Sequence, residues 1–287
     1  MLTPRHWLDE REAFLFDTQG YAVLRGVLDA DCVVRLNAAV DANAEAFRTD
    51  PTRTGSAGSA LSGERARLTS FTDPLRWPRE DAKAFAELIA PPEVQRWLDS
   101  LMGRGWRLDG APQILLAGTG AEGLHLHGSG SQWFSPVTYY ACQNGLIRCG
   151  LVTVEYALSP AGPGDGGFAC IPGSHKANFG CPRSIAECES DAGVVHQPVL
   201  EPGDAVVWTE ALFHGTLPWR AAHERRVALF RYTPRVMNLS GAYLHWSLPA
   251  WVSELDLRDR VALNAPYLED RPVLLEDGTV SRVTEWY

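Results

Sequence analysis

Apolar and polar residues change their spacing along this 287-residue chain near position 106. Before that position, apolar side chains recur at the three- and four-residue intervals of amphipathic helices. After it, they form short runs separated by Gly, Pro and Asp, which is typical of strands joined by turns. The pattern therefore predicts a helical N-terminal region and a β-rich region after it.

The N-terminal region is expected to hold helices around one short strand. Residues 8–28 predict a helix, a glycine turn and a strand. Asp29 or Asp31 is expected to cap a second helix that runs to about Arg48. Residues 81–101 are predicted to be helical, with a break at two consecutive prolines.

In the β-rich region we predict short strands, separated by Gly, Pro and Asp turns, over 114–117, 151–157, 168–171, 194–196, 205–208 and 227–232. Many short strands with turn residues between them favour a β-sandwich or jelly roll, with the N-terminal helices packed outside. No Ser-, Gly- or Pro-rich linker divides the sequence, so we expect a single domain over 1–287, with a helical region over 1–105, a core over 106–235 and a tail over 236–287.

Composition excludes several classes of partner. The chain is 45% hydrophobic and 21% charged, with a net charge of -9 and a pI near 5.4, and it has no basic patch for a nucleic acid. No run approaches the ~18 apolar residues of a membrane span, and the N-terminus lacks the apolar region of a signal peptide. The six cysteines show no CxxC spacing, so we expect free thiols and a cytoplasmic location.

Histidines provide the candidate chemistry. His125 and His127 stand two positions apart in a predicted strand, so both imidazoles are expected to face one cavity. The small residues Gly128 and Ser129 follow them and would leave that cavity open. His214 lies much further along the chain. We interpret these pieces as components of one metal site.

Two further blocks carry a resemblance to a known family. The first block runs from Gly162 to Lys176 and ends in Pro172-Gly173-Ser174-His175-Lys176. The second block begins at Glu201-Pro202-Gly203-Asp204 and leads to His214 and then to Arg225-Arg226. Together with Gly20-Tyr21-Ala22-Val23-Leu24, they resemble the phytanoyl-CoA dioxygenase family of Fe(II)- and 2-oxoglutarate-dependent oxygenases, over about residues 14–235. The resemblance implies a double-stranded β-helix of the jelly-roll, cupin-like type, with iron at its mouth and 2-oxoglutarate as co-substrate.

The resemblance also implies roles for individual residues. Such enzymes hold Fe(II) with two histidines and one carboxylate, and the distal histidine corresponds to His214. Arg225 follows His214 at the offset that the family uses for the arginine that binds the far carboxylate of 2-oxoglutarate, which is a bidentate task. Arg226 would face the opposite way in a strand, so we expect Arg225 to be the anchor. Thr216 is expected to add a hydroxyl contact to the co-substrate.

The chain departs from the family at the first ligand pair, where a His-x-Asp motif is usual. In one register, His125 and His127 take the two places, and three histidines form a neutral site suited to Fe, Zn or Ni. In the other, which we favour, His127 is the first ligand and Ser129 stands at the place of the acid. A serine hydroxyl is a poor ligand for Fe(II), so water or a halide would fill that position, as chloride does in the halogenases of this superfamily. A third option recruits a remote carboxylate, Glu155 or Asp165.

The expected function is Fe(II)- and 2-oxoglutarate-dependent hydroxylation of a C–H bond in a small organic molecule, with dioxygen as the other substrate. The alternatives are a halogenase that uses chloride, and a non-catalytic relative that binds a small acid through Arg225. Segments 50–64, a surface loop or a lid, and 134–148 are expected to shape the pocket. Neither segment identifies the substrate, and the sequence predicts no oligomeric state.

Overall fold

A computed structural model describes the protein over residues 8–49, 59–66, 68–130, 135–190, 192–239, 248–266, 272–275 and 277–282. Most of the predicted loop or lid 50–64, its positions 50–58, lies outside the described residues. Within the described residues, no helix combines the length and the apolar character needed to cross a membrane.

The N-terminal segment follows the predicted order of helix, turn and strand. Helix α1 (Glu10–Gln19) begins with a reciprocal capping box between Asp9 and Glu12 and ends at Gly20, whose φ of 81° favours glycine. Strand β1 (Tyr21–Leu24) comes next.

Helix α2 (Ala30–Ala42) begins at Asp29, whose carboxylate accepts a hydrogen bond from the Cys32 backbone N–H. The expected continuation to Arg48 is wrong. The Asn43 side chain donates to the Ala39 carbonyl at the helix end, and the 3-10 turn η1 (Ala44–Ala46) and strand β2 (Arg48–Thr49) follow.

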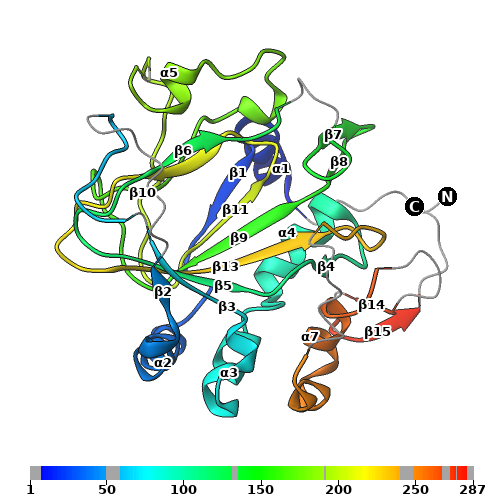
Figure 1. Ribbon diagram of the computed structural model, residues 1–287. Helices are drawn as coiled ribbons and strands as arrows, with labels where there is room; N and C mark the ends of the chain where they lie inside the picture. Colours follow the sequence, from blue (N-terminus) through cyan, green and yellow to red (C-terminus); the bar gives the residue numbers. More distant parts are fainter. Residues whose placement is uncertain are drawn as a thin grey trace.

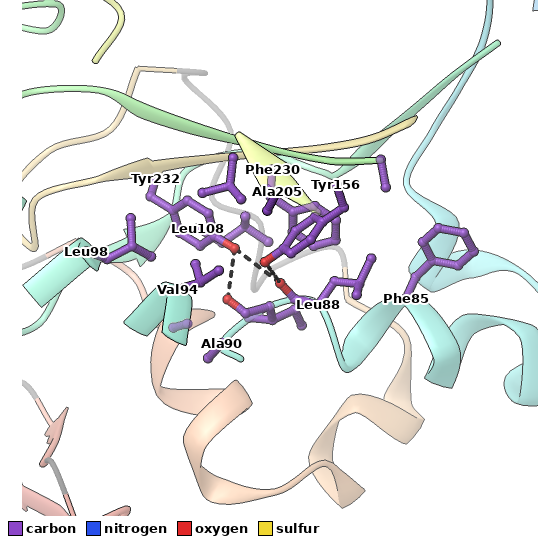
Figure 2. Packing of buried hydrophobic residues seen from close by; sticks show 14 of the residues in the cluster. Phe85, Leu88, Ala90, Val94, Leu98, Leu108, Tyr156, Ala205, Phe230 and Tyr232 are labelled. Carbon is purple, nitrogen blue, oxygen red and sulfur yellow. Dashed lines mark hydrogen bonds between the residues drawn. The ribbon is translucent and has the colours of Figure 1, made fainter. Parts of the chain in front are cut away.

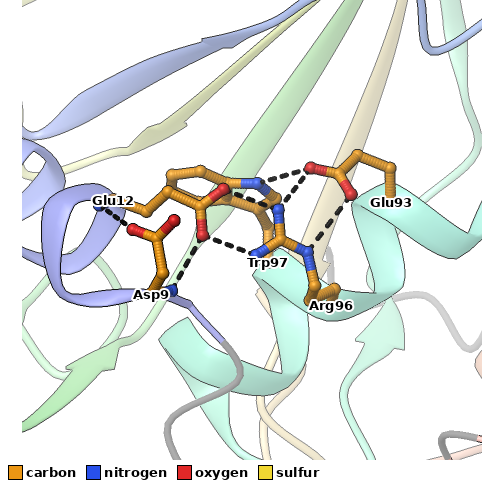
Figure 3. Close-up of polar contacts among 5 residues, drawn as sticks. All are labelled: Asp9, Glu12, Glu93, Arg96 and Trp97. Carbon is orange, nitrogen blue, oxygen red and sulfur yellow. Dashed lines mark hydrogen bonds and ion pairs between the residues drawn. The ribbon is translucent and has the colours of Figure 1, made fainter.

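The predicted break at the two prolines separates α3 (Arg79–Ala86) from α4 (Pro92–Met102). Helix α4 is joined to α1 by Arg96, which donates to both carboxylate oxygens of Glu12, at 2.6 and 2.7 Å, and to Glu93 at 2.6 Å (Figure 3). The Arg96 guanidinium lowers the pKa of Glu12. This charge-assisted contact attaches α1 to α4.

Two antiparallel sheets, one large and one small, contain most strands of the β-rich region. The large sheet has the order β1-β11-β9-β13-β5-β3-β2, with β4 also paired to β13. Its other strands are β3 (Thr69–Thr72), β4 (Arg107–Leu108), β5 (Gln113–Ala117), β9 (Val152–Ala157), β11 (Ala205–Thr209) and β13 (Arg225–Thr233). The small sheet has the order β10-β12-β6 and consists of β6 (Leu124–His127), β10 (Gly167–Cys170) and β12 (His214–Leu217). Figure 1 shows β6 and β10 on one side of the large sheet and α2 and α3 on the other.

Several segments differ from expectation. β1, β2 and β3 precede residue 106, so the N-terminal region also contributes to the sheet. Segment 194–196 forms no extended strand: His196 makes an isolated bridge with Cys170. Much of the predicted pocket segment 134–148 is a hairpin of β7 (Tyr140–Gln143) and β8 (Leu146–Cys149).

The remaining elements are short. They are η2 (Pro74–Arg76), η3 (Ser174–Lys176), α5 (Arg183–Ala186), η4 (Ala250–Glu254), α7 (Leu257–Ala262), β14 (Pro272–Leu274) and β15 (Val280–Arg282). The last two pair as a hairpin in the tail that the sequence left unplaced.

The large sheet is covered on both faces. On its helical side, the Tyr156 and Tyr232 hydroxyls donate to the Leu88 and Ile89 carbonyls just after α3, within a cluster of buried apolar side chains (Figure 2). A second apolar cluster joins the other face to the small sheet and includes Phe168 and Trp208. Because both faces of β9 are covered, all six of its residues are buried. This sandwich places the small sheet, with its histidines, over the large one.

Candidate active site between the two sheets

A cavity of about 310 Å³ lies between the sheets. Its walls include side chains from both, among them His127 and His214 from the small sheet and Glu155, Arg225 and Arg231 from the large one. The structure therefore brings together the three residues on which the sequence hypothesis depends, His127, His214 and Arg225.

The two histidines face each other across neighbouring strands. His127 and His214 are partners in the antiparallel pair β6–β12, and their ring centroids are 4.5 Å apart. His127 Nδ1 lies 3.1 Å from the His125 carbonyl, and His214 Nδ1 lies 2.8 Å from the Leu212 carbonyl. Since a carbonyl only accepts, each Nδ1 carries the proton, and each Nε2 keeps a free lone pair.

Both rings are suited to coordination in the neutral form. His214 is buried, whereas His127 is exposed to solvent. Surrounding protein still removes enough water to lower the pKa of His127, and the nearby His214 lowers it further. Neutral imidazole is the form that binds metals.

His125 does not share this cavity. The register between β6 and β12 shifts by one residue, from His214 opposite His127 to Thr216 opposite Leu124. This irregularity places Leu124 and His127 on the cavity wall, three positions apart, and interrupts the alternation that the prediction assumed. His125 is exposed and lines a separate surface pocket near α5.

Ser129, at the place of the acid, forms a hydrogen bond with the backbone. Ser129 Oγ donates to the Thr138 carbonyl at 2.5 Å. The preceding Gly128 packs so closely against the turn before β12 that a Cβ there would lie 2.4 Å from the Leu212 carbonyl oxygen. Glycine therefore permits the close approach of the two strands beside the histidines.

Both remote carboxylates that the sequence suggested already have hydrogen-bond partners. Glu155 lines the cavity but accepts a hydrogen bond from Arg225 Nη2 at 2.7 Å, with both side chains buried. Asp165 accepts from the Gly162 backbone N–H at 2.7 Å, which closes its own turn.

Sequence reasoning missed Glu210. Its Oε2 lies 3.6 Å from His214 Nε2, and its Oε1 accepts a hydrogen bond from the Thr153 hydroxyl. The available signal was the four-residue spacing between Glu210 and His214 across the turn that joins β11 to β12. In an extended strand, residues four positions apart lie too far from each other for contact. The spacing indicates contact between Glu210 and His214 only once the turn between them is known.

The two arginines of β13 separate as expected for a strand. Arg225 faces the cavity, whereas Arg226 forms ion pairs with Asp41 and Glu224 outside it. Thr216 also lines the cavity, and its hydroxyl accepts from the Leu124 backbone N–H at 3.0 Å. Its own proton stays available to a ligand.

The donor set fits a non-haem iron site in which the protein would occupy only some of the coordination positions. Two imidazoles present Nε2 to one cavity, and a carboxylate lies beside the second. Within the described residues, no three His, Cys, Asp or Glu side chains form a ready-made metal cluster. The pair His127 and His214 is therefore the preformed portion of the site.

Comparison with known proteins supports this assignment of the fold. The chain aligns with crystal structures of HygX from Streptomyces hygroscopicus with nickel and 2-oxoglutarate bound (TM-score 0.64, 24% identity, 80% of this chain and 89% of that one) and of EctD from S. alaskensis with 2-oxoglutarate and 5-hydroxyectoine (0.57, 19%, 82% and 79%). It also aligns with SnoN, a non-haem 2-oxoglutarate-dependent epimerase from nogalamycin biosynthesis (0.57, 19%, 91% and 96%). A search of curated sequences finds no significant match.

A comparison with protein families matches residues 16–227 to phytanoyl-CoA dioxygenase (PhyH). The match covers most of the chain and confirms the family, the cupin-type fold and the enzyme class that the sequence predicted, an oxygenase that depends on iron and 2-oxoglutarate. The chain belongs to the phytanoyl-CoA dioxygenase family.

Proposed function

We propose that the protein hydroxylates a C–H bond of a small organic molecule, with iron held by His127 and His214 and 2-oxoglutarate anchored by Arg225. The observation that carries the proposal is that His127, His214 and the buried Arg225 line a single cavity, while a backbone carbonyl occupies Nδ1 of each imidazole. HygX and EctD, which share the fold, have been crystallised with 2-oxoglutarate.

Each cavity residue has a defined task. The His125 and Leu212 carbonyls fix the two rings, so that Nε2 of each would remain free to hold the metal. When bound, iron would supply the activation of dioxygen, with 2-oxoglutarate as a source of electrons. Arg225 has N–H groups beyond the one bound to Glu155, and these bind the far carboxylate of the co-substrate. The Thr216 hydroxyl donates to the same ligand.

Apolar walls complete the cavity. Phe168, Trp208 and Leu229 line it and limit the access of water on their side of the cavity. At about 310 Å³ the cavity lies at the small end of the range for ligand pockets, roughly 300–1,000 Å³. We therefore propose a compact substrate. We propose dioxygen as a further substrate. The cytoplasmic location of the protein stays a prediction.

Turnover of 2-oxoglutarate tests the proposal without a known substrate. Purified protein, loaded with Fe(II) under anaerobic conditions and then exposed to air, is expected to release succinate slowly. His214→Ala and His127→Gln should abolish this release and should also abolish Fe(II) binding in metal analysis. Retention of 2-oxoglutarate binding without metal binding or succinate release would instead identify a non-catalytic binding protein.

A further inference from the structure

The missing acid of the first ligand pair leaves the third protein ligand to be identified. Ser129 stands at the expected position, but its hydroxyl is committed to the Thr138 carbonyl. Glu155 is held by Arg225, and Asp165 closes a turn. A carboxylate from elsewhere in the chain is therefore needed if the site is to have the two-histidine, one-carboxylate set that suits non-haem Fe(II).

Glu210 has the required position. The turn after β11 carries it, and its backbone N–H donates to the Leu151 carbonyl at 3.0 Å. The Thr153 hydroxyl, fully buried on β9, donates to Oε1, which leaves Oε2 directed at His214. The side chain is 13% exposed, so most of it is shielded from solvent.

The distance is that of two ligands on one metal. Nitrogen and oxygen ligands lie ~2.1 Å from a bound metal, so neighbouring ligands are roughly 3.0–3.6 Å apart, depending on the angle between them. Glu210 Oε2 and His214 Nε2 are 3.6 Å apart. An ion bound to His214 Nε2 can therefore also contact Glu210 after little movement of the carboxylate.

The same turn positions both side chains. The Leu212 backbone N–H donates to the Thr209 carbonyl at 2.9 Å, which reverses the chain between Glu210 and His214. The Leu212 carbonyl then accepts from His214 Nδ1. One short turn thus orients the imidazole and brings the carboxylate beside its free nitrogen.

We propose that Glu210 is the third protein ligand of the iron, in place of the acid that position 129 lacks. This inference rests on the proposed function, since it assumes that His127 and His214 bind the metal. The carboxylate would supply the negative charge that a His-x-Asp pair normally provides, from the turn before the distal histidine. A carboxylate in that position leaves no ligand vacancy for a halide and favours hydroxylation.

Metal affinity tests the ligand directly. The apo protein, as the full chain, is titrated with Co(II) by calorimetry and by visible absorption, which reports the donor set of the ion. Glu210→Gln keeps the size of the side chain and an acceptor for Thr153, so it is expected to fold. Glu210→Gln should weaken Co(II) binding on the order of 100-fold, because the loss of a ligand should cost at least as much affinity as the loss of a residue that only supports a ligand. The variant should also change the absorption spectrum of the bound ion.

Two variants complete the comparison. Ser129→Ala, at the place of the missing acid, should bind Co(II) like the wild type, because the serine is no ligand. Glu210→Asp keeps the charge and should bind more weakly than the wild type but more tightly than Glu210→Gln. This variant also provides the test if the glutamine variant fails to fold.

The outcomes separate the two proposals. Wild-type Co(II) affinity and spectrum in folded Glu210→Gln, together with lost binding in His214→Ala, would refute the ligand role of Glu210 and leave the proposed function intact. Unchanged binding in both variants would overturn both. An ion pair between Glu210 and a protonated His214, with no role in coordination, would give the unchanged spectrum in Glu210→Gln.

Discussion

Arg225 donates a hydrogen bond to Glu155 at 2.7 Å inside the cavity, and both side chains are almost completely buried. The two residues come from neighbouring strands of the large sheet, β13 and β9. The guanidinium therefore has a buried negative partner before any co-substrate arrives. Such a pair restricts the orientation of the guanidinium, whose remaining N–H groups can receive a second carboxylate.

Loss of the Glu155 charge should lower the free energy of unfolding, and 2-oxoglutarate should stabilise the variant more than the wild type. In Glu155→Gln the buried arginine loses its counter-charge, and removal of one partner of a buried ion pair costs ~3 kcal/mol. Urea denaturation should show this loss, and added 2-oxoglutarate should recover some of it by supplying a carboxylate. Glu224→Gln removes an exposed partner of Arg226 and should change the free energy of unfolding by less than ~1 kcal/mol. Equal stabilisation of wild type and Glu155→Gln by 2-oxoglutarate would argue against Arg225 as the anchor.

The two adjacent arginines should differ sharply in their effect on 2-oxoglutarate binding. Arg225→Lys keeps a positive charge beside Glu155 but lacks the planar fork that binds a carboxylate through two N–H groups. We expect its KM for 2-oxoglutarate to rise by roughly tenfold or more, which corresponds to ~1.4 kcal/mol. Arg226→Lys, which alters a side chain outside the cavity, should keep the wild-type KM. A higher KM in Arg226→Lys, with an unchanged KM in Arg225→Lys, would instead identify Arg226 as the residue that binds 2-oxoglutarate.

Chloride should have no role in the reaction. Replacement of chloride by sulfate at constant ionic strength should leave succinate release and product identity unchanged, because Glu210 is proposed to fill the position that a halide would need. Ser129→Ala should behave in the same way, since it loses only the hydrogen bond to Thr138. A chlorinated product, or turnover that requires chloride, would establish the halogenase alternative.

The buried His175 should reduce stability in mild acid. Its Nε2 donates to the Asp17 carbonyl at 3.1 Å, while Lys176 and Tyr140 lie beside it. Burial lowers the pKa of His175 to about 4, from an ordinary value near 6.5. Between these values the unfolded chain binds a proton that the folded chain does not, so stability is present above pH 6.5 and falls as the pH falls toward 4, by up to roughly 3 kcal/mol.

Urea denaturation of His175→Gln between pH 4 and pH 7 checks this expectation. The free energy of unfolding of the variant should depend less on pH across this window than that of the wild type. His223→Gln, at an exposed position, is the control and should keep the wild-type slope. An identical slope for His175→Gln and the wild type would contradict the role of His175.

Several residues of the site could be predicted because short sequence motifs and the two-residue repeat of a strand determine where they lie. Alternation along β13 directs Arg225 into the cavity and Arg226 away from it, as the two-residue repeat of a strand requires. His214 and Arg225 lie in a block whose order and spacing resemble those of the family, whereas His127 stands where the chain departs from the usual His-x-Asp pair. The helices α1, α3 and α4 follow from capping residues and prolines, which act within one or two turns of the chain.

The sequence by itself determined the family, the cupin-type fold and three cavity residues, because these depend on motifs and on the repeat of the backbone. Only the tertiary structure placed His125 outside the cavity and Glu210 beside His214. The first results from a register shift between β6 and β12, and the second from a turn held by β9. Both depend on hydrogen bonds between segments far apart in the chain, and no local spacing encodes such contacts.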